Sequence, residues 1–280
     1  MRRLFIPNSK FEIRNSILSC VLLLVACSRE TPSPHAVHRV VTLSPNLTEI
    51  VFAIGAGDDV VATDDYSDVP PAAKRLPKVG GVQPSLERIV AAKPDLVLAP
   101  AIADYASLSA ALKSNHIPIE IIRTDRIGEI IPVMRRLGKE LDAPKTDEAV
   151  RAIRDGLARE TRKRAKSPRI LFVGWADPLY VGGRETFIDD LYAITGARNA
   201  VQVKAWPQYA VESVIAAPPD IVLYTSHIDI APLLRAAPEL RNRAMIVAVE
   251  ENRYTRPGPH VVDAAADLNG IIDRWEKKSH

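Results

Sequence analysis

Four side chains, each in a loop or at the end of a predicted strand, have the chemistry to hold a flat ligand. Trp206 lies in the polar segment "AWPQ", where an exposed indole is unfavourable unless it meets an apolar surface such as a ring. Tyr66 follows the predicted strand "VVATDD", and Trp175 ends the predicted strand "RILFVGW". Arg256, in "RYTRPGP", has a planar set of donors that suits amides, carboxylates or phosphates. The simpler alternatives are core packing for Trp175 and a surface charge for Arg256.

No motif in the sequence indicates catalysis. The chain lacks a GxSxG nucleophile elbow, a Walker loop and a GxGxxG dinucleotide fingerprint. Its histidines show neither HxH nor HExxH spacing, and it has no cysteine cluster that could bind zinc. Asp64, Asp65 and Asp68 cluster near Tyr66, but aspartates are common in turns. We therefore expect no enzyme, no cofactor and no metal site; a secreted hydrolase is the alternative.

One segment of the chain occurs twice in similar form. The stretches "ERIVAAKPDLVL" (Glu87–Leu98) and "ESVIAAPPDIVL" (Glu212–Leu223) share seven of twelve residues. In each copy, a short helix with a glutamate in its first turn leads through Pro-Asp into a buried strand. A glutamate there also interacts favourably with the helix dipole, which is the purely structural explanation. The repeat predicts two similar lobes.

Short apolar runs alternate with helical segments in both halves, which predicts an α/β fold with mostly parallel sheets. Asn46 suits the N-cap of the first helix and Gly55 its end. The remaining helices are expected near Ser85–Ala92, Tyr105–Asn115, Ile127–Leu141, Thr186–Thr195 and His260–Trp275, and strands in "RVVTLS", "VVATDD", "DLVLAP", "IPIEII", "RILFVGW", "DIVLYTS" and "MIVAVE".

A long charged helix over Lys145–Lys166 should join the lobes. Its apolar residues Ala149, Ile153 and Leu157 recur every four positions, which gives one buried stripe. At 1.5 Å per residue it would span about 33 Å and would limit hinge closure. The predicted domains are an N-terminal lobe (39–144), a connecting helix (145–167) and a C-terminal lobe (168–280). A ligand cleft is expected between the lobes, at the carboxyl ends of the strands.

The first 26 residues resemble a signal peptide. They carry four basic residues and one acidic residue, so the remaining 33 basic and 33 acidic residues balance. The basic pI therefore gives no reason to expect a nucleic-acid partner. The apolar run Ile17–Ala26 is too short to span a membrane, and it ends at Cys27 in a sequence like the bacterial lipobox. We expect a lipid on Cys27 and a tether over 27–38; an ordinary secretory signal is the alternative. Removal of Cys20 with the signal leaves no disulfide.

The chain from Arg39 to Trp275 resembles the substrate-binding proteins of ABC importers for cobalamin, haem and iron-siderophores. The resemblance rests on the order and spacing of "RVVTLSPNLTEIVFAIGAGDDVVATDDYSDVPPAAKRLPKVGG", "SLERIVAAKPDLVL", "WPQYAVESVIAAPPDIVL" and "RPGPHVVDA". The "WPQ" at 206–208 is most like the cobalamin branch. This implies a monomeric, lipid-anchored protein of the periplasm or cell envelope. It would capture a corrinoid and deliver it to an ABC permease dimer in the inner membrane.

The resemblance also implies roles for single residues. Tyr66, Trp206 and Arg256 match ligand-contacting positions, and Trp175 is a further candidate for the cleft. Glu87 and Glu212 match the glutamates, one on each lobe, that engage permease arginines. Two positions depart from the cobalamin pattern, because Val82 and Pro100 stand where aromatic residues can occur. Alternatives are haem, with Tyr66 or His227 as axial ligand, an iron-siderophore, or a lipid-anchored scaffold or sensor without transport.

Overall fold

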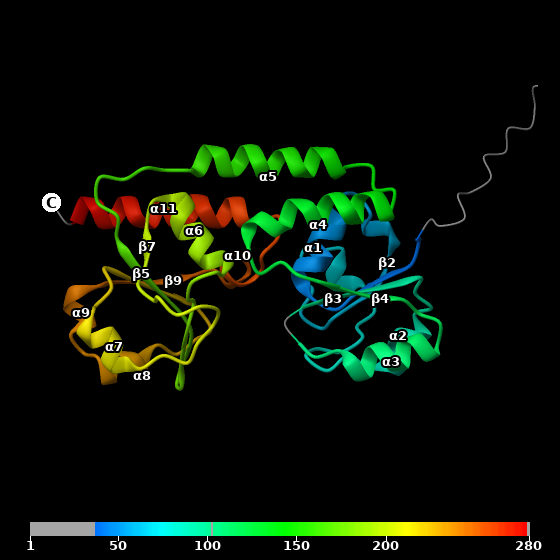
Figure 1. Ribbon diagram of the computed structural model, residues 1–280, viewed down its shortest axis with the longest axis horizontal. Helices are drawn as coiled ribbons and strands as arrows, with labels where there is room; N and C mark the ends of the chain where they lie inside the picture. Colours follow the sequence, from blue (N-terminus) through cyan, green and yellow to red (C-terminus); the bar gives the residue numbers. More distant parts are fainter. Residues whose placement is uncertain (1–36, 102, 279–280) are drawn as a thin grey trace, which may run out of the picture. The chain divides into compact units, whose positions relative to one another are not determined.

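Two mostly parallel sheets form the framework of the protein. The computed structural model describes residues 37–101 and 103–278 (Figure 1). The first sheet has the order β2-β1-β3-β4 and is parallel throughout. In the second, β5, β7, β8 and β9 pair in parallel, and only β6 is antiparallel. The strands are β1 Val40–Thr42, β2 Val60–Thr63, β3 Leu96–Pro100, β4 Ile119–Ile122, β5 Arg169–Ala176, β6 Leu179–Val181, β7 Arg198–Asn199, β8 Ile221–Thr225 and β9 Met245–Val249.

Helices cover both faces of each sheet, so the predicted α/β fold with mostly parallel sheets is confirmed. The helices are α1 Pro45–Ala53, α2 Leu86–Ala91, α3 Ala106–Ser114, α4 Ile127–Glu140, α5 Thr146–Glu160, α6 Phe187–Thr195, α7 Val211–Ala216, α8 Ala231–Ala236, α9 Leu240–Arg243, α10 Glu251–Thr255 and α11 Val261–Lys278, with 3-10 turns at Gly57–Asp59 and Ala73–Arg75. Cys27, the signal peptide and most of the tether lie outside the described residues. Within the described part of the chain, no helix is both long and apolar enough to cross a membrane.

The repeated segment occupies the same place in both sheets. Its first copy is α2 followed by β3, which pairs with β1 and β4. Its second copy is α7 followed by β8, which pairs with β5 and β9. Successive strand residues face opposite sides of a sheet. One face of each sheet packs against the helix of the repeated segment, α2 or α7. The other face packs against α1 and α4 in the first sheet and against α6 and α11 in the second. α2 and α7 therefore lie on the sides of their sheets away from α5 (Figure 1).

Asn46 is not the N-cap that the sequence predicts. The capping position belongs to Ser44, which is extended, and Pro45 takes the first helical position. Asn46 is buried instead, where it accepts a hydrogen bond from the Ser44 hydroxyl and donates one to Thr124 Oγ1 at 2.8 Å. Its side chain thus joins the first turn of α1 to the loop after β4.

The connecting helix α5 is unbroken but ends at Glu160, six residues before the predicted end at Lys166. Tertiary contacts explain this early end of the helix. Arg164 is largely buried and donates to the Thr195 carbonyl and to Asn269 Oδ1. Asn269 Nδ2 in turn donates to the Glu160 carbonyl at the end of the helix. These contacts outweigh the good helix propensity of "TRKRAK". The predicted stripe is correct, since Ile153 is buried and Ala149 and Leu157 pack against the core.

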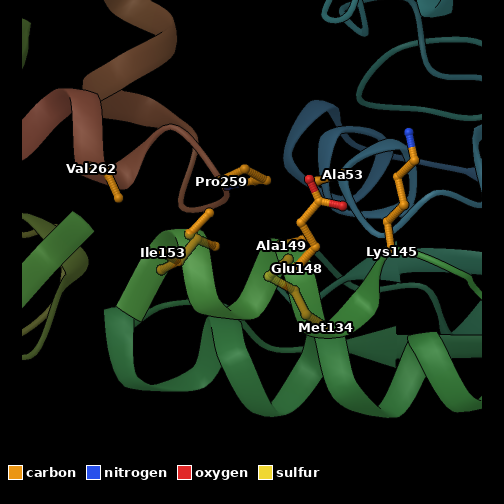
Figure 2. A pocket seen from close by; sticks show the side chains of 9 residues that line it. Ala53, Met134, Lys145, Glu148, Ala149, Ile153, Pro259 and Val262 are labelled. Atoms are coloured by element: carbon orange, nitrogen blue, oxygen red, sulfur yellow. The ribbon is translucent and has the colours of Figure 1, made fainter. Parts of the chain in front are cut away.

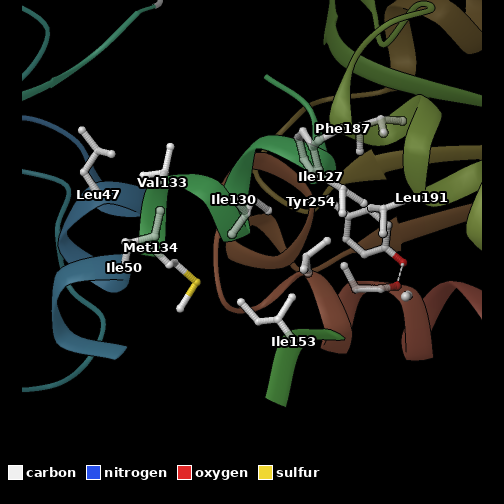
Figure 3. Close-up of a cluster of buried hydrophobic side chains, with 14 of the residues drawn as sticks. Leu47, Ile50, Ile127, Ile130, Val133, Met134, Ile153, Phe187, Leu191 and Tyr254 are labelled. Atoms are coloured by element: carbon white, nitrogen blue, oxygen red, sulfur yellow. Dashed lines mark hydrogen bonds between the residues drawn. The ribbon is translucent and has the colours of Figure 1, made fainter. Parts of the chain in front are cut away.

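One hydrophobic core runs from the first sheet to the second. Ile50 of α1, Met134 of α4 and Ile153 of α5 belong to the same buried cluster as Leu191 of α6 and Tyr254 of α10 (Figure 3). α11 packs along α5 and α6, which extends this cluster over the second sheet (Figure 1). The lobes are therefore joined by packed helices as well as by the chain itself, which opposes a large hinge motion.

The contact between α5 and α11 depends on a glycine. A Cβ added to Gly156 would lie 2.6 Å from Val262 Cγ1, well inside van der Waals contact. We expect Gly156→Ala to lower the free energy of unfolding by about 1–3 kcal/mol, the usual cost of overpacking. The control is Gly128→Ala in α4, where a Cβ would meet nothing within 4 Å. That change should be neutral or stabilising by up to about 1 kcal/mol. Urea denaturation of both variants measures the difference, and equal stability of the two would contradict the close packing.

Candidate functional site

A cleft of about 830 Å³ lies at the carboxyl ends of the parallel strands, as the topology predicts. In the first lobe its lining comes from the loop after β1, the start of α1, the ends of β3 and β4 and the loops after β2, β3 and β4. In the second lobe it comes from β5, α6, the loop after β7, and α10 with the two residues that follow it. Its volume is within the range of small-molecule sites. The apolar and aromatic lining consists of Pro45, Tyr66, Pro100, Ala101, Ile122, Phe172, Gly174, Phe187, Trp206 and Pro257. The polar lining consists of Ser44, Asn46, Asp65, Asp68, Thr124, Asp125, Glu251, Thr255 and Arg256.

Tyr66 and Trp206 are large aromatic side chains that line the cleft and remain accessible to solvent. Their exposed fractions are 58% and 43%. Trp206 is held edge-on against Phe172, with ring centroids 5.9 Å apart and an interplanar angle of 75°. This leaves much of the indole available to a ligand. The structure thus brings together two of the three predicted aromatic residues.

Trp175 does not line this cleft. Phe172 and Gly174 of β5 line it instead. A β-bulge between Val173 and Trp175 disturbs the pairing of β5 with β6. Trp175 is 52% exposed, and its indole N–H donates to the Asp177 carbonyl at 2.8 Å. The core-packing alternative for Trp175 is therefore wrong. Its contact with a ligand stays a prediction that the cleft geometry does not support.

The loop that carries Tyr66 is fixed by the aspartate cluster. Asp64 accepts a hydrogen bond from the Tyr66 amide at 3.0 Å and another from the Ser67 hydroxyl. Burial raises the pKa of Asp64, while these hydrogen bonds oppose the rise. Lys78 donates to the Ser67 carbonyl at 2.6 Å from the other side. The expectation that Asp64 serves turn structure is confirmed, and the turn holds Tyr66 at the cleft.

Arg256 lines the cleft, but its guanidinium is already engaged with the first lobe. Nη1 donates to Glu49 Oε1 at 3.1 Å and to Asp68 Oδ1 at 2.7 Å, and Nη2 donates to the Tyr66 carbonyl at 3.3 Å. The side chain is only 13% exposed. Arg256 follows α10 of the second lobe, so these bonds tie the two lobes together beside the cleft. Because two carboxylates already compensate its positive charge, Arg256 would attract an anionic ligand only weakly.

Glu49, the buried carboxylate partner of Arg256 beside the cleft, is a residue that sequence reasoning missed. Its side chain is 2% exposed, and Oε2 has no hydrogen-bond partner among the described residues, although His260 Nε2 lies 3.8 Å away. Burial raises the pKa of Glu49, and the bond from Arg256 opposes this. The available signal was a single acid inside the apolar run "LTEIVFAI", since a buried carboxylate needs a cationic partner.

The remaining sequence candidates are placed as follows. Pro100 lines the cleft, whereas Val82 is 79% exposed and does not. His227 also lies outside the lining, and its Nδ1 is 3.0 Å from Glu251 Oε2. Across the described residues, no group of three or more His, Cys, Asp or Glu side chains is arranged to hold a metal ion.

Glu87 and Glu212 occupy equivalent positions on the two lobes. Each lies in the first turn of its helix, α2 or α7, and each is exposed. Within the described part of the chain, neither carboxylate has an ion pair or hydrogen bond of its own. Both helices lie on the sides of their sheets away from α5 (Figure 1). The two carboxylates are therefore available for one equivalent contact per lobe.

A second, smaller cavity lies between α1, α4, α5 and the start of α11. Its volume is about 340 Å³, and Figure 2 shows Ala53, Met134, Ile153 and Val262 around it, with Lys145 and Glu148 as its charged side chains. None of the sequence-predicted site residues lines it. The cleft is larger and combines exposed aromatic rings with polar groups, so it is the candidate binding site.

Two similar, mostly parallel sheets with a cleft at the carboxyl ends of their strands are an architecture suited to binding a small solute. Residues 40–254 match the model of the periplasmic binding protein family, and the chain belongs to that family. Its function is therefore binding rather than catalysis.

Individual relatives are consistent with this family. The chain is 30% identical to the vitamin B12-binding protein of Yersinia pseudotuberculosis, over 89% of this chain and 91% of the relative. It is 26% identical to an uncharacterized ABC transporter substrate-binding lipoprotein of Bacillus subtilis, over 82% and 78%. Among solved structures, a haem-binding protein of Roseiflexus superposes with a TM-score of 0.72 and 25% identity, over 84% and 97%. The vitamin B12-binding protein of Vibrio cholerae gives 0.73 and 22%, over 87% and 100%.

Proposed function

We propose that this protein is the substrate-binding component of an ABC importer, and that it captures a corrinoid in the cleft and delivers it to the permease. The observation that carries the proposal is the pair of exposed aromatic rings, Tyr66 and Trp206, on the wall of an open cleft of about 830 Å³. A flat macrocycle covers such rings and removes their apolar surface from water. The vitamin B12-binding relatives support this choice of ligand.

The location and partners follow from the same proposal. A periplasmic binding protein acts in the periplasm or cell envelope, and a lipid on Cys27 would hold it at a membrane surface. Delivery requires a permease, and Glu87 and Glu212 would each meet one subunit of a permease dimer. The glutamates lie in the first turns of α2 and α7 and neither lines the cleft, so the docking residues are separate from the ligand site.

Ligand titration of the soluble protein (residues 28–280) tests the proposal. Cyanocobalamin, cobinamide, haemin and a ferric siderophore are compared by equilibrium dialysis and by quenching of tryptophan fluorescence. We expect saturable binding of the corrinoids and quenching of Trp206, because its indole lines the cleft. Binding of haemin or of the siderophore alone would keep the binding fold and replace the corrinoid as ligand. Absence of binding by all four would favour a scaffold without transport.

A further inference from the structure

The charged side chains around the cleft are strongly unequal in sign. Four carboxylates line it, those of Asp65, Asp68, Asp125 and Glu251; Asp125 is partly buried and the other three are exposed. Among the described lining residues, Arg256 is the only arginine, and there is no lysine. The carboxylates come from both lobes, so a ligand in the cleft would face negatively charged protein groups on more than one side.

The single lining arginine does not offset this charge for a ligand. Arg256 donates to Glu49 and Asp68, at 3.1 and 2.7 Å, and so is already matched by two carboxylates. Glu49 lies behind it and is almost completely buried. An incoming anion would have to break this arrangement to gain a cation, and would leave Glu49 buried without its partner.

Basic side chains also lie near the carboxylates but outside the lining, among them Lys78, Arg123 and His227. Arg123 Nη1 is 3.3 Å from Asp125 Oδ2, and its side chain is 67% exposed. His227 pairs with Glu251, and both side chains are about half exposed. Exposed pairs of this kind are screened by water and salt, so they weaken the negative field of the cleft without reversing it.

We propose that the cleft selects a ring ligand whose edge presents amide N–H groups or positive charge, and rejects a ring of the same shape whose edge presents carboxylates. This inference rests on the proposed function and specifies the ligand chemistry of the same site. Amide groups donate charge-assisted hydrogen bonds to carboxylates. A carboxylate edge meets like charge and loses its hydration without gaining a cation, which is selection by repulsion.

A pair of corrins that differ only at the edge tests the proposal. The dicyano complex of cobyrinic acid heptaamide is compared with that of the heptacarboxylic acid, by equilibrium dialysis at pH 7.5 and about 0.15 M salt. We expect the acid to bind at least 100-fold more weakly, and this ratio to shrink at about 1 M salt, where like-charge repulsion is screened. Affinities within threefold of one another would overturn the proposal. The balanced charge of residues 27–280 excludes a general effect of net charge.

A second pair separates this inference from the proposed function. Haemin, with two propionates, is compared with its diamide under the same conditions. If neither corrin binds but the diamide binds much better than haemin, the corrinoid proposal fails and the charge selection stands. If corrins bind and the acid form binds equally well, the charge selection fails and the corrinoid proposal stands. Failure of both amide rings to bind overturns both.

Variants of the network around Arg256 give an independent test. Glu49→Gln with Asp68→Asn removes two carboxylates and frees the arginine, so the preference for the heptaamide should fall at least tenfold. The control is Asp142→Asn with Asp155→Asn, two exposed carboxylates outside the cleft lining, which should leave the preference unchanged. If the first pair unfolds, the exposed Asp68→Asn alone should lower the preference about threefold. An unchanged preference in a folded Asp68→Asn variant contradicts the proposal.

Discussion

Trp206→Ala should weaken corrinoid binding about 30-fold or more, the equivalent of roughly 2 kcal/mol. The indole is a large, partly exposed surface that Phe172 already holds in place, so little ordering is needed when a ring covers it. Because the substitution also removes the fluorescent reporter, the affinity should be measured by equilibrium dialysis of cyanocobalamin. Thermal unfolding of the variant checks that the loop after β7 remains folded.

The matched control for this change is Trp175→Ala. Trp175 has nearly the same exposure as Trp206 but does not line the cleft. Its replacement should change the dissociation constant by less than about threefold, since only residues in contact with the ligand contribute strongly. A large loss of affinity in Trp175→Ala, with little effect of Trp206→Ala, would mean that the ligand sits near the β5–β6 turn and outside the cleft described above.

Glu87→Ala combined with Glu212→Ala should abolish the stimulation of the permease ATPase and leave corrinoid affinity within about twofold. Neither carboxylate lines the cleft, so the ligand does not sense their loss. Each would instead face one subunit of a symmetric partner, where charged pairs set encounter and orientation. The measurement is ATP hydrolysis by the reconstituted permease with saturating ligand. Each single variant should retain an intermediate stimulation.

The control for the double variant replaces two other acids in a first helical turn. Asp147→Ala with Glu148→Ala removes the same charge from the start of α5, away from α2 and α7. It tests the purely structural explanation, in which such acids only complement the helix dipole at about 0.3–1 kcal/mol each. Equal loss of stimulation in this control would contradict a docking role for Glu87 and Glu212. So would loss of ligand binding in the double glutamate variant.

Much of the frame was predictable because it follows from local pattern. Strands such as β3 and β8 are continuous apolar runs, and the repeated glutamate helices precede them directly, so the two-lobe plan and the equivalence of Glu87 and Glu212 could be inferred without coordinates. Tyr66 and Trp206 could be placed at the cleft for a related reason. Both lie in loops beside parallel strands, whose carboxyl ends meet at one edge.

Local pattern alone determined the order of elements and the repeat, since each depends on residues close together in the chain, and the family resemblance added Tyr66 and Trp206 as residues of the cleft. Only the tertiary structure decided that α5 ends at Glu160, that Trp175 lies outside the cleft and that Arg256 is bound to Glu49. The last pair joins residues 207 positions apart. The free energy of burying a carboxylate depends on the group that meets it in space, and sequence spacing carries no information about that distance.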